Sequence, residues 1–96
     1  PYQVCIVPIG GKKDPAVNDT ADRLYEQLQA QGIEVLLDDR DMGPGPRFAD
    51  MDLLGIPHRV VVSSKGLAAN QLEYKHRSNP DSEMLDEASI MERLGA

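Results

Sequence analysis

Charged side chains cluster where an apolar run ends in the middle of the chain. The acidic and basic sequence Asp-Asp-Arg-Asp at residues 38–41 follows the apolar residues 33–37, and Arg47 comes after a bend rich in glycine and proline. In open α/β sheets, ligand sites lie beyond the carboxyl ends of the strands. We therefore expect Arg47 and the side chains of residues 38–40 to project from such an end and to form a functional site.

The carboxylates at residues 38–41 could suggest a site for a hard cation. Adjacent side chains on an extended segment point in opposite directions, however, and the arginine between them would oppose a cation. We expect one carboxylate, Asp38 or Asp39, to hold Arg40 while Arg40 is presented outward. Its planar fork can donate two hydrogen bonds at once to a phosphate or to a base edge. The alternative is a purely structural Arg40, paired with one of those acids.

A second candidate site is Gly-Gly-Lys-Lys at residues 10–13, between a predicted strand and a predicted helix. Phosphate groups bind in this position because helix N-termini offer backbone N–H groups. The spacings GxxxxGK[ST] and GxGxxG are both missing from the chain. We expect Lys12 and Lys13 to make a general basic contact with a phosphate, the alternative being a solvated turn.

Catalysis and metal binding have little support in the sequence. Cys5 lies inside an apolar run, as a buried and unreactive thiol does. His58 and His76 lack the spacing of zinc ligands, and there is no GxSxG nucleophile motif. We expect no catalytic residue, no metal and no cofactor in this chain.

Length and charge limit the class of protein. A chain of 96 residues forms one domain, and a formal charge of −6 argues against binding nucleic acid by bulk attraction, although it permits a local basic patch. A single cysteine favours a reducing compartment, for which we expect the cytoplasm. No apolar stretch approaches the roughly 18 residues of a membrane span, so no membrane partner is expected.

The first two thirds of the chain alternate between predicted strands and helices. Strands are predicted at residues 4–9, 33–37 and 58–63, because their apolar cores are typical of strands buried on both faces of a parallel sheet. Asp14 and Pro15 predict the start of a first helix that ends at Gly32. A second helix is predicted over residues 45–54, with Phe48, Met51 and Leu54 on one side.

The last third has a different pattern. Residues 71–77 alternate with period two, which predicts a half-exposed strand with Glu73, Lys75 and Arg77 on one side. Such a row of donors and acceptors can read the unstacked bases of single-stranded RNA. A short antiparallel strand at residues 84–85 and a helix capped by Asp86 complete the chain. The pattern predicts one α/β domain over residues 1–96 with a mixed five-stranded sheet.

The strings GIEVLLDDR (residues 32–40), FADMDLLGIPH (48–58) and EYKHR (73–77) carry a family resemblance. They closely resemble the anticodon-binding domain that stands C-terminal in class II aminoacyl-tRNA synthetases, most of all in bacterial-type prolyl-tRNA synthetases. The resemblance implies a three-layer α/β/α fold with strand order 2-1-3-4-5 and strand 4 antiparallel. Since the sequence begins at Pro1, we expect a domain cut from a larger synthetase.

The resemblance also implies a partner, the anticodon stem-loop of proline tRNAs with its GG-containing anticodon. Contacts are implied at Arg40, Lys65 and the row Glu73, Lys75 and Arg77. ATP and magnesium would belong to a separate catalytic domain of a proline–tRNA ligase, and the full-length protein would be a homodimer. The alternative is a protein-interaction module of a synthetase-like accessory subunit, because the Gly-Pro-Gly-Pro of the bend replaces a more charged sequence.

Overall fold

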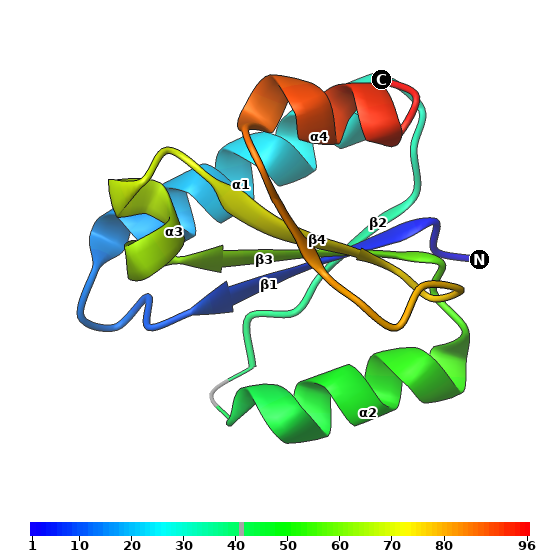
Figure 1. Ribbon diagram of the computed structural model, residues 1–96, viewed down its shortest axis with the longest axis horizontal. Coiled ribbons are helices and arrows are strands. Elements are labelled where there is room, and N and C mark those ends of the chain that lie inside the picture. Colours follow the sequence, from blue (N-terminus) through cyan, green and yellow to red (C-terminus); the bar gives the residue numbers. More distant parts are fainter. Residues whose placement is uncertain (41) are drawn as a thin grey trace.

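A mixed five-stranded sheet forms the centre of the computed structural model, which describes residues 1–40 and 42–96 (Figure 1). The strands in chain order are β1 (Val4–Ile9), β2 (Val35–Leu37), β3 (His58–Ser63), β4 (Leu72–His76) and β5 (Glu83–Leu85). They lie in the order β2-β1-β3-β4-β5. β1 is parallel to β2 and β3, whereas β4 is antiparallel to both of its neighbours. The α/β class, the strand order and the antiparallel fourth strand are therefore confirmed.

Helices cover both faces of the sheet (Figure 1). The helices are α1 (Pro15–Ala30), α2 (Pro44–Leu54), α3 (Ser64–Ala68) and α4 (Glu87–Arg93). α1 and α4 lie on one face and α2 on the other, while the short α3 lies beyond the carboxyl end of β3. Among the described residues, no helix has the length and apolar character needed to cross a membrane.

Two apolar clusters fill the space between these layers, because alternate residues of a strand face opposite sides. In β1, Val4 and Ile6 face α1 and α4, whereas Cys5 and Val7 face α2. The larger cluster includes Leu24 of α1 and Ile90 of α4. The smaller cluster centres on Met51 of α2.

Side-chain caps begin the helices where the sequence predicts them. Asp14 accepts a hydrogen bond from the backbone N–H of Ala16, and Asp86 accepts one from that of Ser89. Gly55 ends α2 in the left-handed conformation, with φ of 70°. These caps confirm the predicted boundaries at the start of α1, the end of α2 and the start of α4.

The structure adds to or differs from the sequence-based expectations at three places. β2 begins at Val35 rather than at residue 33, because the Ile33 N–H donates to the Leu28 carbonyl and closes the turn after α1. α3 was not expected, although Ser63 caps it by accepting from the Gly66 N–H. Leu54 lies on the outer side of α2, with 64% of its surface exposed.

Candidate nucleic-acid interface

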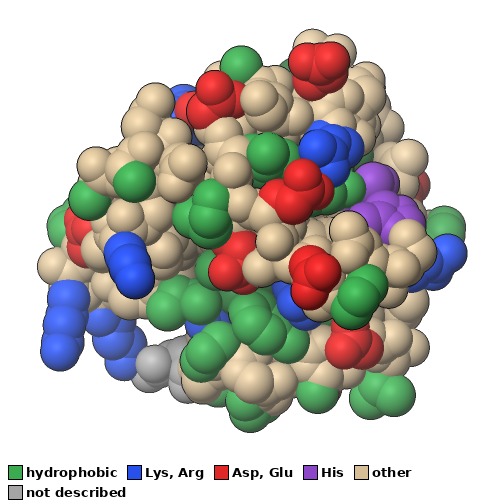
Figure 2. Space-filling model, in the orientation of Figure 1, with side chains coloured by type: hydrophobic (Ala, Val, Ile, Leu, Met, Phe, Trp, Pro, Cys, Tyr) green, Lys and Arg blue, Asp and Glu red, His purple; other side chains and the backbone are tan. Residues whose placement is uncertain are grey.

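Four of the predicted contact residues gather at one edge of the sheet. Since β1, β2 and β3 are parallel, their carboxyl ends meet at this edge, which we call the carboxyl edge. Lys12 and Lys13 follow β1, Arg40 follows β2, and Lys65 follows β3. Lys12, Lys13 and Lys65 are all exposed. The space-filling view shows basic side chains projecting at this end of the molecule, while acidic ones spread over the rest of the visible face (Figure 2).

A hollow of about 680 Å³ opens between the loops after β1 and β2. Its lining combines glycine backbone with charged side chains of both signs; the charged members are Lys12, Lys13, Asp22, Asp39, Arg40 and Arg47. Four cations and two carboxylates leave this lining with a formal charge of 4 − 2 = +2, in a chain whose total is −6. The hollow is therefore a local basic site on an acidic protein.

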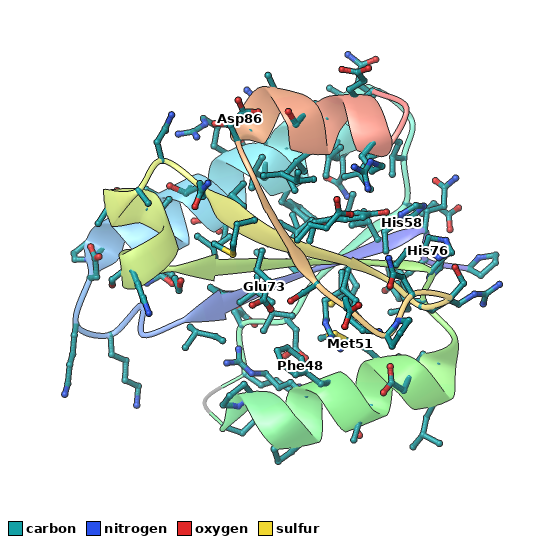
Figure 3. The ribbon with its side chains drawn as sticks, in the orientation of Figure 1. Phe48, Met51, His58, Glu73, His76 and Asp86 are labelled. Atoms are coloured by element: carbon teal, nitrogen blue, oxygen red, sulfur yellow. The ribbon has the colours of Figure 1, made fainter. Side chains whose placement is uncertain are left out.

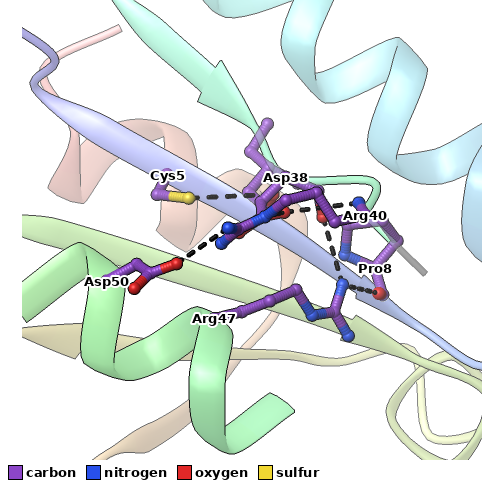
Figure 4. Close-up of polar contacts among 7 residues, drawn as sticks. Cys5, Pro8, Asp38, Arg40, Arg47 and Asp50 are labelled. Atoms are coloured by element: carbon purple, nitrogen blue, oxygen red, sulfur yellow. Dashed lines mark hydrogen bonds and ion pairs between the residues drawn. The ribbon is translucent and has the colours of Figure 1, made fainter. Parts of the chain in front are cut away.

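Arg40 is held by two carboxylates (Figure 4). Its Nε donates to Asp38 Oδ1 at 2.8 Å and its Nη2 donates to Asp38 Oδ2 at 2.7 Å. Its Nη1 donates to Asp50 Oδ2 at 2.7 Å. The prediction that one acid holds Arg40 is confirmed for Asp38, and the second partner, from α2, was not predicted. Asp41, which the sequence placed in the same cluster, lies outside the described residues.

Arg40 lowers the pKa of Asp38. The main cause is the pair of side-chain hydrogen bonds from the guanidinium, which stabilise the ionised carboxylate, and the Arg40 backbone N–H adds a smaller contribution. Burial acts in the opposite direction, because Asp38 is only 5% exposed. Asp38 is thus a buried anion that depends on Arg40.

Arg47 does not project from the strand end as expected. It is only 4% exposed, and its Nη1 donates to the backbone carbonyls of Pro8 at 2.8 Å and Asp38 at 3.1 Å (Figure 4). Its Nε is buried and has no hydrogen-bond partner among the described residues. Arg47 therefore ties the amino end of α2 to the carboxyl ends of β1 and β2. The sequence shows this role only indirectly, since the Pro8 carbonyl comes from a strand 39 residues away.

The loop after β1 presents lysines rather than a bare helix end. Asp14 already occupies the N–H groups at the start of α1, so an anion would meet a carboxylate there. Gly10 has φ of 78°, and Asn18 donates to the Gly11 carbonyl at 2.9 Å. A side chain at Gly11 would collide with Asn18. The phosphate contact that the sequence predicts is therefore assigned to the lysine side chains and not to the helix N–H groups, and it stays a prediction.

The row formed by Glu73, Lys75 and Arg77 along β4 does not join the cations at the carboxyl edge. Because β4 is antiparallel, Lys75 and Arg77 approach the opposite edge of the sheet, where His58 begins β3. The Arg77 side chain donates to the Gly55 carbonyl at 2.7 Å and so caps the end of α2. Glu73 lies nearer the middle of the strand, opposite Val61. Figure 3 shows Glu73 on the side of the sheet that faces Phe48 of α2. The structure thus separates Lys75 and Arg77 from the four cations at the carboxyl edge.

Arg59 is a basic residue that sequence reasoning missed. Its guanidinium lies over the Phe48 ring at 4.0 Å from the centroid, and its Nε is buried with no hydrogen-bond partner in the described part of the chain. Arg59 pairs with Lys75 across β3 and β4, so both point to the α2 side of the sheet. The sequence carries a signal for this orientation. Neighbouring residues of a strand face opposite sides of the sheet, and Arg59 directly precedes the buried Val60.

The two histidines lie at the edge opposite the hollow. Nδ1 of His58 lies 2.7 Å from the Tyr74 hydroxyl, and the rings of His58 and His76 meet edge to face at 5.0 Å. Burial, followed by the nearby His76, lowers the pKa of His58. Tyr74 is 2% exposed, so it lies in the core and offers no stacking surface.

Cys5 is buried, as expected, and burial raises the pKa of its thiol to about 12. Such a thiol stays protonated at neutral pH and does not act as a nucleophile. Within residues 1–40 and 42–96, no group of three or more metal-ligating side chains comes together. The cations of the carboxyl edge have the chemistry for charge-assisted binding of an anionic partner.

Comparisons with known proteins agree with this chemistry. A family described as "Anticodon binding domain" matches residues 3–96. The chain is 52% identical over 95 residues to a "Proline--tRNA ligase" of Xanthomonas axonopodis pv. citri (strain 306), covering 99% of this chain and 17% of that protein. It is 49% identical over 94 residues to a "Proline--tRNA ligase" of Stenotrophomonas maltophilia (strain R551-3), covering 98% of this chain and again 17% of the relative. The chain thus spans about one sixth of the length of these relatives.

Proposed function

On the premise that the chain belongs to the anticodon-binding domain family, we propose that it binds the anticodon stem-loop of proline tRNA through the carboxyl edge of its sheet. The observation that carries this proposal is the gathering of Lys12, Lys13, Arg40 and Lys65 at the ends of three parallel strands. Contacts from lysine and arginine to phosphates supply affinity and fix the orientation of a nucleic acid.

Recognition of the bases has to use hydrogen bonds rather than stacking. Only 4% of the residues are aromatic, and Phe48 is half-buried beneath Arg59. Glu73 is a half-exposed carboxylate with no ion pair among the described residues. A carboxylate can accept hydrogen bonds from the Watson–Crick edge of guanine, which carries neighbouring N–H donors. Glu73 is therefore our candidate for reading a guanine of the anticodon.

The role proposed for the full-length protein follows from the relatives. In a protein as long as they are, this domain would serve a proline–tRNA ligase whose ATP- and magnesium-dependent step takes place in a separate catalytic domain. A homodimer in the cytoplasm is part of the same proposal. The chain itself would contribute tRNA selection and no catalytic group.

A titration with tRNA tests this proposal. We expect the chain to bind tRNA with a proline anticodon, and replacement of both anticodon guanines to weaken binding roughly tenfold or more, as expected for the loss of paired hydrogen bonds to a base. Fluorescence anisotropy at moderate, fixed salt measures both affinities. Equal affinity for the two tRNAs would contradict base recognition by this domain.

A matched pair of variants tests which edge meets the tRNA. Lys13→Ala removes a lysine from the carboxyl edge, and Lys75→Ala removes one from β4 near the opposite edge. If Lys13 contacts a phosphate, its loss should reduce the slope of log K against log salt by about 0.7, the value for one phosphate of single-stranded RNA. Lys75→Ala should leave the slope unchanged. The reverse result would move the interface to β4.

A protein-interaction module remains the second candidate because of one observation. Leu53 and Leu54 of α2 are 86% and 64% exposed and border a second hollow beside β2. Adjacent exposed leucines are a feature of protein-binding surfaces. Failure of the chain to bind any tRNA in the titration would favour this candidate.

A further inference from the structure

Arg40 stands between two hollows of the surface. It lines the basic hollow of about 680 Å³ and also the neighbouring hollow of about 430 Å³ beside β2 and α2. Its side chain is 46% exposed despite its two ion pairs. A ligand in the basic hollow can therefore reach the guanidinium.

The two carboxylates that hold Arg40 differ in accessibility. The Asp38 side chain is 3% exposed and uses both of its oxygens on the Nε and Nη2 side of the guanidinium. The Asp50 side chain is 46% exposed and uses a single oxygen on Nη1. An exposed ion pair contributes little to stability, whereas a buried bidentate pair is costly to break. Asp38 is therefore the fixed partner and Asp50 the replaceable one.

The donor count of the guanidinium leaves room for an anion. Arginine has five N–H donors, and the carboxylates of Asp38 and Asp50 engage three of them. Nη1 and Nη2 each keep one N–H group that these carboxylates do not engage. A phosphate that replaced Asp50 would place two oxygens on the Nη1–Nη2 end of the fork and form a bidentate pair, which is stronger than the single bond to Asp50.

We propose that the Nη1–Nη2 end of Arg40 is a binding position for a phosphate group and that Asp50 occupies it in the unbound protein. The phosphate displaces the Asp50 carboxylate, while Asp38 continues to hold the other side of Arg40. The identification of the phosphate as one of the RNA backbone rests on the proposed function. Free phosphate would use the same position.

This arrangement favours ligands that make several contacts. A single phosphate gains little by replacing a carboxylate that is already in place. A nucleic acid that also contacts Lys13 raises the local concentration of its next phosphate at Arg40. Asp50 thereby competes with anions for Arg40, and this competition disfavours isolated anions more than a ligand that makes several contacts.

Two aspartates of the same helix provide the test. Asp50→Asn removes the competitor, while Asp52→Asn makes the same change in charge at an exposed residue whose side chain has no hydrogen bond or ion pair among the described residues. We expect D50N to bind proline tRNA roughly two- to fivefold more tightly than D52N, which is the range for one exposed ion pair. Equal gains in the two variants would mean that only bulk charge matters. Weaker binding by D50N would mean that Asp50 positions Arg40 instead, and either result would overturn the proposal.

Further variants control for structure and for residual hydrogen bonding. Asp50→Ala excludes a bond from the asparagine amide to Arg40, and alanine is well tolerated in a helix. In the double variant D50N/R40K, lysine keeps the charge but lacks the fork, so the gain should disappear. A gain that persists with lysine would place the phosphate elsewhere. Circular dichroism confirms that each variant is folded.

Inorganic phosphate separates this inference from the proposed function. The NMR signal of the Arg40 Nε–H group should shift at lower phosphate concentration in D50N than in D52N. If neither variant binds tRNA but this difference is seen, the phosphate position stands and the anticodon proposal fails. If both bind tRNA and the Arg40 signal responds identically, the phosphate position is wrong while tRNA binding stands.

Discussion

Replacing Leu24 by alanine is expected to lower the free energy of unfolding by about 2–5 kcal/mol. Leu24 is 1% exposed and lies in the larger apolar cluster, between α1 and the sheet. The substitution removes buried methyl groups and leaves a cavity, because the rigid strands cannot close over it. Urea unfolding followed by circular dichroism measures the change.

Leu53 offers the same substitution in a different environment. It is 86% exposed on α2, so Leu53→Ala should change the free energy of unfolding by no more than about 0.5 kcal/mol. A similar loss in the two variants would contradict the packing of α1 against the sheet. A large loss for Leu53 alone would indicate that its face of α2 is covered in solution.

The second large effect is expected at Asp38. Asp38→Ala should cost about 2–3 kcal/mol of unfolding free energy, because it removes charge-assisted hydrogen bonds made in a buried position. The cost stays below that of a fully buried pair, since Arg40 is half exposed and keeps Asp50. Asp39→Ala is the matched control, because Asp39 is exposed and its loss should have little effect.

The contribution of Asp38 should depend on pH. Its pKa in the folded chain lies below the ordinary value of 3.8, so the unfolded chain binds the proton more readily. The stabilisation is therefore complete above about pH 5 and is lost as the pH falls through 3.8 and below. The difference in stability between the unmodified chain and Asp38→Ala should shrink over that interval, as followed by urea unfolding at each pH. A constant difference would show that Asp38 acts by packing and not by charge.

Elements with strong local signals were predicted well. β3 was expected at residues 58–63 and is observed as His58–Ser63, because an apolar run between a proline and a polar exit leaves little choice. The caps at Asp14, Gly55 and Asp86 also follow from neighbouring residues, since each cap is a contact within a few positions of the chain. Position 33 was misassigned because its backbone is used by the preceding turn rather than by the sheet.

The candidate site was predicted only in part. The sequence indicated that Arg40 would be held by a neighbouring acid, and Asp38 is two residues away. It could not show that Asp50, ten residues along the chain, is the second carboxylate that holds Arg40. Nor could it show that Arg47 turns inward to the Pro8 carbonyl. These contacts depend on how α2 lies against the ends of β1 and β2.

By itself, the sequence determined the order of the strands and of α1, α2 and α4 along the chain, most of the buried faces and the family, because these follow from local periodicity and from strings of neighbouring residues. Only the tertiary structure decided which charges meet. Parallel pairing brings Lys13, Arg40 and Lys65 to one edge, and the reversed direction of β4 carries Arg77 to the other. The physical reason is that strand direction and helix docking are set by contacts between distant residues. Such contacts leave no periodic trace in the sequence.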